Sequence, residues 1–408
     1  MQGETIVCLA TEAWDSLWRS TQQYMSRLAR DNRVLYFEPG RRPDRRVFSE
    51  WRRNLRNFVE LRPRQIEPNL VLIPTPPALP LARQKLPRLL LRALFPVVVR
   101  INAGVLLRQV RRGLRALNVR RPILWALNPA HYSLVGRCGE RLAVYFNYDE
   151  FANFEQNERI KDMVLRIDDE LTRRAGVVFA TSRAQWSRRK AINPETHFMP
   201  NGVDFDLFNR ALTAQGPLPA DIAGAPRPVI GYAGWIGSQI EVDLLLRVAE
   251  AYPHGSLVMV GPDELPASPQ ARALHALPNV RFLGRKPREA LPDYLRAFDV
   301  ALIPYALRGF VLTAYPVKLH EYLAAGRAVV ATAMPELQPY RPIVRIASDA
   351  DDFVRLVSEA LTDHSAESIA ARVALARQHT WDRRMEEICS ILDARLRANE
   401  QPAGGRRG

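Results

Sequence analysis

The chain has 408 residues, too many for one ordinary hydrophobic core, so we expect two domains. Hydrophobic residues make up 47% of it and charged residues 25%, which indicates a soluble globular protein and excludes a disordered one. The net charge of +15 comes from 58 Lys and Arg against 43 Asp and Glu.

Three cysteines, Cys8, Cys138 and Cys389, lie far apart and match neither a metal-binding nor a redox spacing. They suit a reducing compartment. The first ten residues predict a short buried strand and lack the basic flank and long apolar core of a signal peptide. We therefore expect a cytoplasmic protein.

Apolar runs that alternate with amphipathic stretches in the first half are typical of a parallel α/β sheet. The predicted helices cover residues 14–30 and about 156–174, and the predicted strands cover residues 5–10, 34–37, 123–127, 142–146 and 177–180.

The basic residues are concentrated in one segment. Residues 41–121 contain 20 Lys and Arg against four Asp and Glu, which exceeds the net charge of the whole chain. Aromatic and aliphatic residues are interleaved with the arginines, and Pro87 and Pro96 are expected to break the apolar run. Docking on an anionic membrane surface fits this pattern best, and binding of an anionic polysaccharide comes next. Binding of nucleic acid is not expected, because no recognition motif is present.

A stretch rich in Pro, Gly and Ala, residues 215–228, marks a boundary, after which strands and helices alternate again. One helix is predicted near 241–250, and further strands are predicted at 229–233, 257–260, 280–283, 300–303 and 328–331. We predict the following division: a first α/β domain (1–200) with the basic insertion 41–121, a linker (201–228), a second α/β domain (229–378), a C-terminal helix (379–400) and a disordered tail (401–408).

Lys318 and Glu321 lie three residues apart at the start of a predicted helix, so their side chains share one face. A lysine at a helix N-terminus favours phosphate, and a carboxylate one turn later can accept hydrogen bonds from ribose hydroxyls. An ordinary surface ion pair is the alternative, and His320 between them is expected to face solvent. Other candidate donor contacts are Arg285, Arg308 and the amides of Gly234, Trp235, Ile236 and Gly237.

Acidic residues that follow buried strands are candidates for the acceptor side. Asp149 and Glu150 follow the strand 142–146, and Asp15 follows the first strand. A carboxylate at such a strand end could orient an acceptor hydroxyl, although a helix cap is an equally common role. The acid pairs at Asp204 and Asp349 are better explained by a linker and a helix cap, so no metal or other cofactor is expected.

Several segments together resemble bacterial nucleotide-sugar glycosyltransferases of the GT-B fold, of the family 4 and family 1 type that includes teichuronic-acid enzymes. They occur in family order at residues 200–204, 231–234, 278–284, 291–300 and 318–326. The resemblance implies two Rossmann-like, doubly wound α/β domains that face a central cleft. It further implies that the domain 1–200 binds the acceptor, that the domain 229–378 binds the nucleotide sugar, and that the helix 379–400 crosses back to the first domain. It also implies transfer of a sugar from a nucleotide-diphosphate sugar to a cell-surface polysaccharide or lipid-linked acceptor, at the inner face of the plasma membrane.

The resemblance also assigns roles to residues. Glu321 matches the second glutamate of the family's Glu-x7-Glu motif, a ribose ligand, whereas Thr313 stands where the first glutamate is usual. A retaining, front-face mechanism needs no strong base, which suits Thr313, and Lys318 would hold phosphate. Thr313 equally leaves open a decayed, non-catalytic carbohydrate-binding protein, and a nucleotide-sugar epimerase of the same fold is a third possibility.

Overall fold

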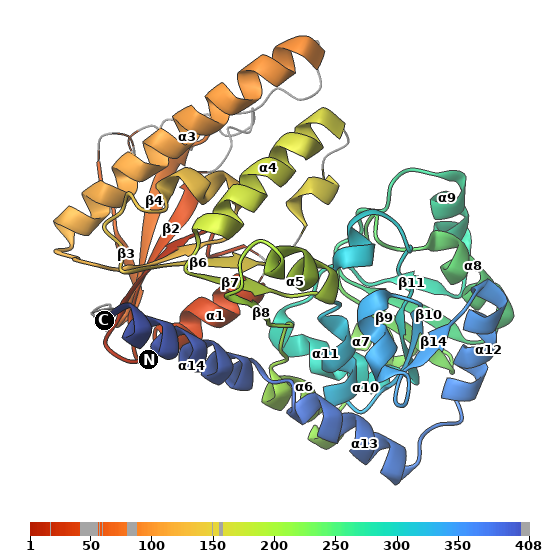
Figure 1. Ribbon diagram of the computed structural model, residues 1–408. Coiled ribbons are helices and arrows are strands. Elements are labelled where there is room, and N and C mark those ends of the chain that lie inside the picture. Colours follow the sequence, from red (N-terminus) through yellow and green to blue (C-terminus); the bar gives the residue numbers. More distant parts are fainter. Residues whose placement is uncertain are drawn as a thin grey trace, which may run out of the picture. The chain divides into compact units, whose positions relative to one another are not determined.

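A computed structural model describes residues 1–16, 18–40, 56, 58, 60–79, 88–148, 150–154 and 158–400. The chain forms two compact units, one made of Met1–Pro200 with Met385–Gly408 and the other of Asn201–Arg384. Each unit is an α/β unit built on a mainly or wholly parallel sheet (Figure 1). The predicted tail 401–408, most of residues 41–59 and residues 80–87 lie outside the described residues.

The first unit contains an eight-stranded sheet in the order β3-β4-β2-β1-β5-β6-β7-β8, parallel except for the antiparallel pair β3 and β4. Its strands are β1 (Thr5–Leu9), β2 (Arg33–Gly40), β3 (Arg64–Glu67), β4 (Leu70–Pro77), β5 (Ile123–Ala126), β6 (Leu142–Asn147), β7 (Val177–Ala180) and β8 (Thr196–Phe198). The central strands are fully buried, which explains why they are continuous apolar runs.

The helices of this unit are α1 (Ser20–Leu28), α3 (Arg88–Ala116), α4 (Glu158–Arg174), α5 (Arg183–Lys190) and most of α14 (Trp381–Glu400), with 3-10 helices η1 (Pro129–Leu134) and η2 (Phe151–Phe154). Two predictions need correction. Helix α1 begins at Ser20 and not near residue 14, and Pro96 lies inside the continuous helix α3 and does not end it. Pro96 is exposed, so its ring meets solvent on the outer side of the helix.

The second unit has a six-stranded parallel sheet in the order β11-β10-β9-β12-β13-β14. Its strands are β9 (Val229–Ala233), β10 (Ser256–Val260), β11 (Val280–Phe282), β12 (Val300–Ile303), β13 (Ala328–Thr332) and β14 (Arg345–Ala347). Its helices are α6 (Phe205–Thr213), α7 (Ala220–Ala223), α8 (Val242–Ala251), α9 (Pro269–Ala276), α10 (Leu291–Ala297), α11 (Lys318–Ala324), α12 (Ala350–Ala360) and α13 (Ala366–Arg377), with 3-10 helices η3 (Arg288–Ala290), η4 (Gly309–Thr313) and η5 (Pro335–Tyr340).

Two hydrophobic clusters cover the two faces of this second sheet. One contains side chains of α6, α10 and α11, and the other contains side chains of α8, α9 and α12. The sheet is therefore doubly wound, as predicted. The segment 201–228, assigned to a linker from its composition, belongs to the second unit, because Phe205 and Phe208 of α6 are buried in its core.

Candidate functional site

The second sheet reverses its winding at β9, which lies between β10 and β12. Ligands of open α/β sheets bind at the carboxyl ends of the strands at such a point. The chain leaves β9 through Gly234, whose amide donates to the Val260 carbonyl at 2.8 Å. A Cβ on Gly261 would lie 1.7 Å from the Gly234 carbonyl oxygen, so only glycine fits at residue 261.

Lys318 and Glu321 lie at this strand end. A Cβ on Gly234 would lie 2.8 Å from Lys318 Cε, so the lysine stem packs directly against the turn. Lys318 Nζ donates to Glu321 Oε2 at 2.8 Å, and the two side chains are 20% and 13% exposed. The predicted juxtaposition is therefore present, and both groups are half-buried and not freely solvated.

Helix α11 is held in this place by its buried face. The Ala233 amide donates to the Tyr322 hydroxyl at 2.9 Å, which ties the helix to the end of β9. Leu319 and Leu323 are fully buried in the core. A lysine, a carboxylate and a glycine turn are thus fixed together by packing, at the strand end where a ligand would bind.

The other predicted donor residues differ in their surroundings. Trp235 is 39% exposed and its Nε1 donates to Glu264 at 2.9 Å. Ile236 is buried, and its amide already donates to the Pro262 carbonyl. Among the predicted amides, only those of Trp235 and Gly237 donate to no backbone carbonyl within the described chain.

Two predicted arginines lie on the loops after β11 and β12. Arg308 is 69% exposed in its side chain and pairs with Glu241 at 2.9 Å. Arg285 is exposed. Within the described residues neither arginine forms a hydrogen bond or an ion pair with Lys318 or Glu321, so the structure does not bring them into the same cluster. Thr313, in η4, donates its hydroxyl to the Phe310 carbonyl at 3.1 Å.

His320 does not face solvent as expected. It is fully buried, its Nε2 lies 2.6 Å from the Tyr315 hydroxyl, and its ring stacks on His379 at 4.3 Å between centroids. Burial, with smaller effects of His379 and Arg384, holds the pKa of His320 well below its usual value. The His320 ring is therefore a neutral packing group on the buried face of α11.

The candidate acceptor acids are not gathered together. Asp149 lies outside the described residues. Asp15 is exposed and pairs with Arg64 at 2.8 Å. Glu150 is 11% exposed in its side chain and pairs with Arg188 and Arg189. Its charge is neutralised inside the unit, so an acceptor role for Glu150 is not supported by its contacts.

Those arginines belong to a buried charge cluster. Arg189, which is fully buried, donates to Asp168 at 2.7 Å, and Asp168 also accepts from the Tyr145 hydroxyl at 2.5 Å. Buried charges require such partners, because an unpaired one is very costly. The cluster joins α4, α5 and β6. Glu150 contributes a negative charge that helps to neutralise its arginines.

The first unit has a cavity of about 690 Å³ at the carboxyl ends of β1, β2, β4 and β5. Its polar lining includes Thr11, Glu12, Asn128 and His131, none of which was predicted. Burial raises the pKa of Glu12, against the opposing effect of Arg19. These residues could have been predicted from their position shortly after the strands β1 and β5. The strand order of the sheet reverses there, and ligands bind at such points.

His131 is the most enclosed of these polar groups. Asn128 caps η1 by accepting the Ala130 amide at 2.9 Å, and this turn carries His131 into the cavity lining. The side chain is 9% exposed, and within the described structure its Nδ1 has no hydrogen-bond partner. Burial lowers the pKa of His131 to about 4, so the ring is a neutral group that can donate or accept.

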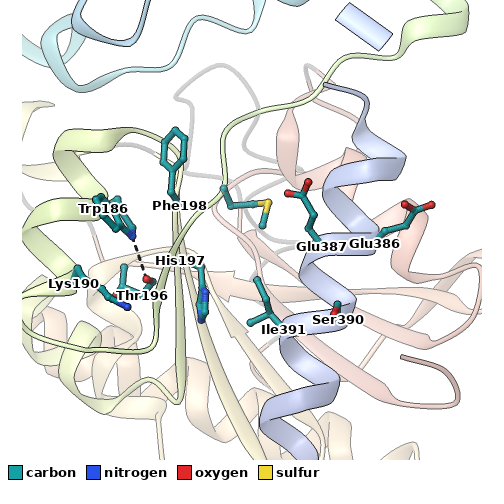
Figure 2. A pocket seen from close by; sticks show the side chains of 10 residues that line it. Trp186, Lys190, Thr196, His197, Phe198, Glu386, Glu387, Ser390 and Ile391 are labelled. Carbon is teal, nitrogen blue, oxygen red and sulfur yellow. Dashed lines mark hydrogen bonds between the residues drawn. The ribbon is translucent and has the colours of Figure 1, made fainter. Parts of the chain in front are cut away.

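A second cavity of the first unit, also about 690 Å³, lies between β8 with α5 on one side and the N-terminal half of α14 on the other (Figure 2). Trp186 donates its indole N–H to the Thr196 carbonyl at 3.2 Å on one side, and Glu387 and Ile391 of α14 line the other. None of the predicted site residues lies there.

In the described part of the chain, no three His, Cys, Asp or Glu side chains are grouped as metal ligands would be. Asp349 caps α12 as predicted, and Asp204 pairs with Arg288 at 2.9 Å. None of the described helices has an apolar stretch long enough to span a bilayer.

Residues 227–363 match the model of a family described as glycosyl transferases group 1. A putative teichuronic acid biosynthesis glycosyltransferase, TuaH of Bacillus subtilis, is 28% identical over 46% of this chain and 48% of its own length. A GDP-mannose-dependent monoacylated alpha-(1-6)-phosphatidylinositol monomannoside mannosyltransferase of Corynebacterium glutamicum is 26% identical over 50% of this chain and 58% of its own. The chain thus spans about half the length of the curated relatives it matches.

Solved structures match over nearly the whole chain. Sucrose-phosphate synthase of Thermosynechococcus elongatus has a TM-score of 0.67 at 16% identity, over 97% of this chain and 100% of that one. Anabaena HepE in complex with UDP has a TM-score of 0.62 at 13% identity, over 96% and 100%. These likenesses establish the fold.

Proposed function

From the place of this chain among GT-B glycosyltransferases of the family 1 and 4 type, we propose that it moves a sugar from a nucleotide-diphosphate sugar to a hydroxyl acceptor. One observation carries the proposal: Lys318 and Glu321 are fixed against the Gly234 turn at the switch point of the second sheet. This strand end lies within residues 227–363, which match the family.

The donor is held by the second unit. The Lys318 ammonium group offsets negative charge on the diphosphate, and the backbone amides of Trp235 and Gly237 donate further hydrogen bonds to it. Glu321 accepts hydrogen bonds from the ribose hydroxyls. Arg285 and Arg308 are secondary candidates for donor contacts, because both are exposed on loops that follow strands of the same sheet.

In the transfer step, the bond between the anomeric carbon and the diphosphate oxygen breaks, and the acceptor oxygen forms a bond to that carbon. Lys318 stabilises the negative charge that develops on the leaving diphosphate. We propose retention of configuration, in which the leaving oxygen takes the acceptor proton from the same face. Thr313 supplies no carboxylate to act as a base, which suits this route, and no metal or other cofactor is invoked.

The acceptor is held by the first unit. Glu12 and the neutral His131 line its cavity and can form hydrogen bonds with hydroxyls. Glu12 also pairs with Arg19 at 3.1 Å, and the exposed Asp15 pairs with Arg64. Asp149, which lies outside the described residues, stays a proposed acceptor-orienting acid. A cell-surface polysaccharide and a lipid-linked acceptor are both compatible with the relatives' names.

We also propose contact with an anionic membrane surface through residues 41–121, at the inner face of the plasma membrane. The described part of this segment that supports the proposal is α3, which has seven arginines and no acidic residue. Leu94, Val97 and Ile101 are exposed on the same helix. Basic residues beside exposed apolar ones are typical of interfacial helices.

A panel of nucleoside diphosphates and nucleotide sugars in a thermal-shift assay tests the donor assignment. We expect one base to raise the melting temperature in both the diphosphate and the sugar form, and no stabilisation by any of them would contradict the proposal. Release of free nucleoside diphosphate separates a transferase from the non-catalytic carbohydrate-binding protein that Thr313 also allows. Inversion at a ring carbon without an acceptor would instead identify an epimerase.

A further inference from the structure

The cavity at the carboxyl end of the first sheet has two chemically different parts. Its polar lining lies near the ends of β1 and β5 and includes Thr11, Glu12 and His131. A separate part of the lining comes from α3 and α4 and includes Phe95, Val99, Leu106, Val164 and Ile167, which are apolar. A ligand that satisfies both parts must itself have a polar end and an apolar end.

The apolar part is continuous with exposed surface. Leu79 lines the cavity and is 50% exposed, so it lies at the opening. Asn102 fixes this opening to α3, because its side chain accepts from the Leu79 amide at 2.8 Å and donates to the Leu79 carbonyl at 3.2 Å.

We infer that this cavity takes an acceptor whose hydroxylated head carries a hydrocarbon chain, with the head at Thr11, Glu12 and His131 and the chain along α3 and α4. This inference rests on the proposed function and chooses between its two acceptor classes. A bare polysaccharide would face the α3 and α4 walls with hydroxyls that find no partner there, which is costly. The volume of about 690 Å³ is that of an ordinary small-molecule site and accommodates a head with part of a chain.

The orphan nitrogen of His131 supports the position of the head. It is a polar group more than nine-tenths buried, it lines the cavity, and its Nδ1 lacks a partner within the described residues. A sugar hydroxyl at this end would supply that hydrogen bond, since a neutral imidazole can donate or accept.

A homologous series of alkyl glucosides, from methyl through butyl and hexyl to octyl, tests the inference by calorimetry on the full chain. All are used below their micelle-forming concentrations and without a bilayer, so that recruitment to a membrane cannot contribute. We expect affinity to rise roughly three- to fourfold per added methylene, the transfer value for a buried CH₂, until the chain fills the cavity. Equal affinity across the series would overturn the inference.

A pair of variants locates the binding. Val99→Asn places an amide in the apolar wall and should flatten the dependence of affinity on chain length. Val97→Asn makes the same change on the exposed side of the same helix and should leave that dependence intact. If both variants or neither of them flattened it, the chain would lie elsewhere and the inference would fail. Unfolding temperatures check that both variants are folded.

Failure of this inference is distinguishable from failure of the proposed function. Stabilisation by a nucleoside diphosphate depends on the second unit and is measured without any acceptor. If the protein binds and turns over the nucleotide sugar but its affinity for alkyl glucosides does not depend on their length, the proposed function stands. Only the inferred acceptor class is then excluded.

Discussion

Lys318 places an ammonium group against the Gly234 turn, with Glu321 as its partner. We expect Lys318→Ala to weaken binding of the preferred nucleoside diphosphate by roughly ten- to hundredfold, the range for a hydrogen bond to a charged group. Binding of the corresponding nucleoside should change far less, because it has no phosphate. Calorimetry with both ligands measures the difference.

Arg247→Ala is the matched control, since it removes one positive charge from an exposed position on α8 where the arginine pairs with Asp351. It should leave both affinities unchanged. Equal losses for diphosphate and nucleoside in Lys318→Ala would remove the phosphate role from this lysine.

Glu321 is expected to act on the ribose and not on the phosphate. Glu321→Gln keeps the size of the side chain and should lower affinity for the nucleoside and for the diphosphate alike, by roughly tenfold. Glu359→Gln, on the exposed side of α12, is the control. An unchanged nucleoside affinity in Glu321→Gln, measured by the same titrations, would exclude the ribose assignment.

His131 should make stability depend on pH. Its pKa in the folded protein is about 4, below the ordinary value of 6.5, so the unfolded chain binds the extra proton first. Stability is therefore fully present above pH 6.5 and is lost as the pH falls toward 4. For this buried group the expected loss between pH 7 and pH 5 is roughly 2 kcal/mol.

Urea unfolding of the protein and of His131→Gln at the two pH values measures that loss. The variant should lose less stability than the protein on going to pH 5, by roughly that amount. Identical pH dependence of the two would show that His131 is accessible to protons in the folded state.

At the scale of elements, the ends of β9 and β10 approach so closely that a side chain does not fit between them. Gly261 has a φ of +147°, and its Cβ would meet the Gly234 carbonyl oxygen at 1.7 Å. We expect Gly261→Ala to displace the Gly234 turn, to cost about 1–3 kcal/mol of stability and to abolish tight nucleotide binding. Chemical unfolding and a nucleotide titration measure the two effects.

Gly224→Ala tests whether any glycine replacement in the second unit would do the same. Gly224 has no positive φ, and a Cβ there meets nothing within 4 Å. This variant should be nearly neutral in both measurements. Normal nucleotide binding by Gly261→Ala would show that the turn tolerates displacement and does not contribute to the site.

At the scale of the whole molecule, the basic excess predicts salt-dependent association with membranes. Sedimentation with vesicles that contain anionic lipid should fall steeply between low and physiological salt, because surface charges are screened over about 10 Å at 0.1 M. Arg108→Glu together with Arg112→Glu, both on the exposed side of α3, should weaken it further.

Arg355→Glu, on α12, changes the charge of an exposed arginine in the second unit and should have little effect. Association that depends neither on salt nor on anionic lipid would exclude electrostatic docking. If Arg355→Glu weakened vesicle association as much as the two α3 substitutions, the association would depend on the net charge of the protein and not on the basic segment 41–121.

The residue pattern was sufficient to predict the buried strands, the doubly wound class and the placement of Lys318 and Glu321 on one helix face. Continuous apolar runs can be satisfied only inside a covered parallel sheet, and helical spacing alone places residues three apart on one face. It did not reveal β3 or β4, because the first is polar and exposed and the second ends in prolines.

Contacts between segments far apart in the chain set which polar residues line a cavity and which neutralise one another. Glu150 was a candidate acceptor-side acid, yet it pairs with Arg188 and the buried Arg189. His320 lies between two candidate residues, yet it packs among aromatic rings. Glu12 and His131 are far apart in sequence and line one cavity, because β1 and β5 are neighbours in the sheet. Long-range strand order governs such encounters, and no local pattern of residues encodes it.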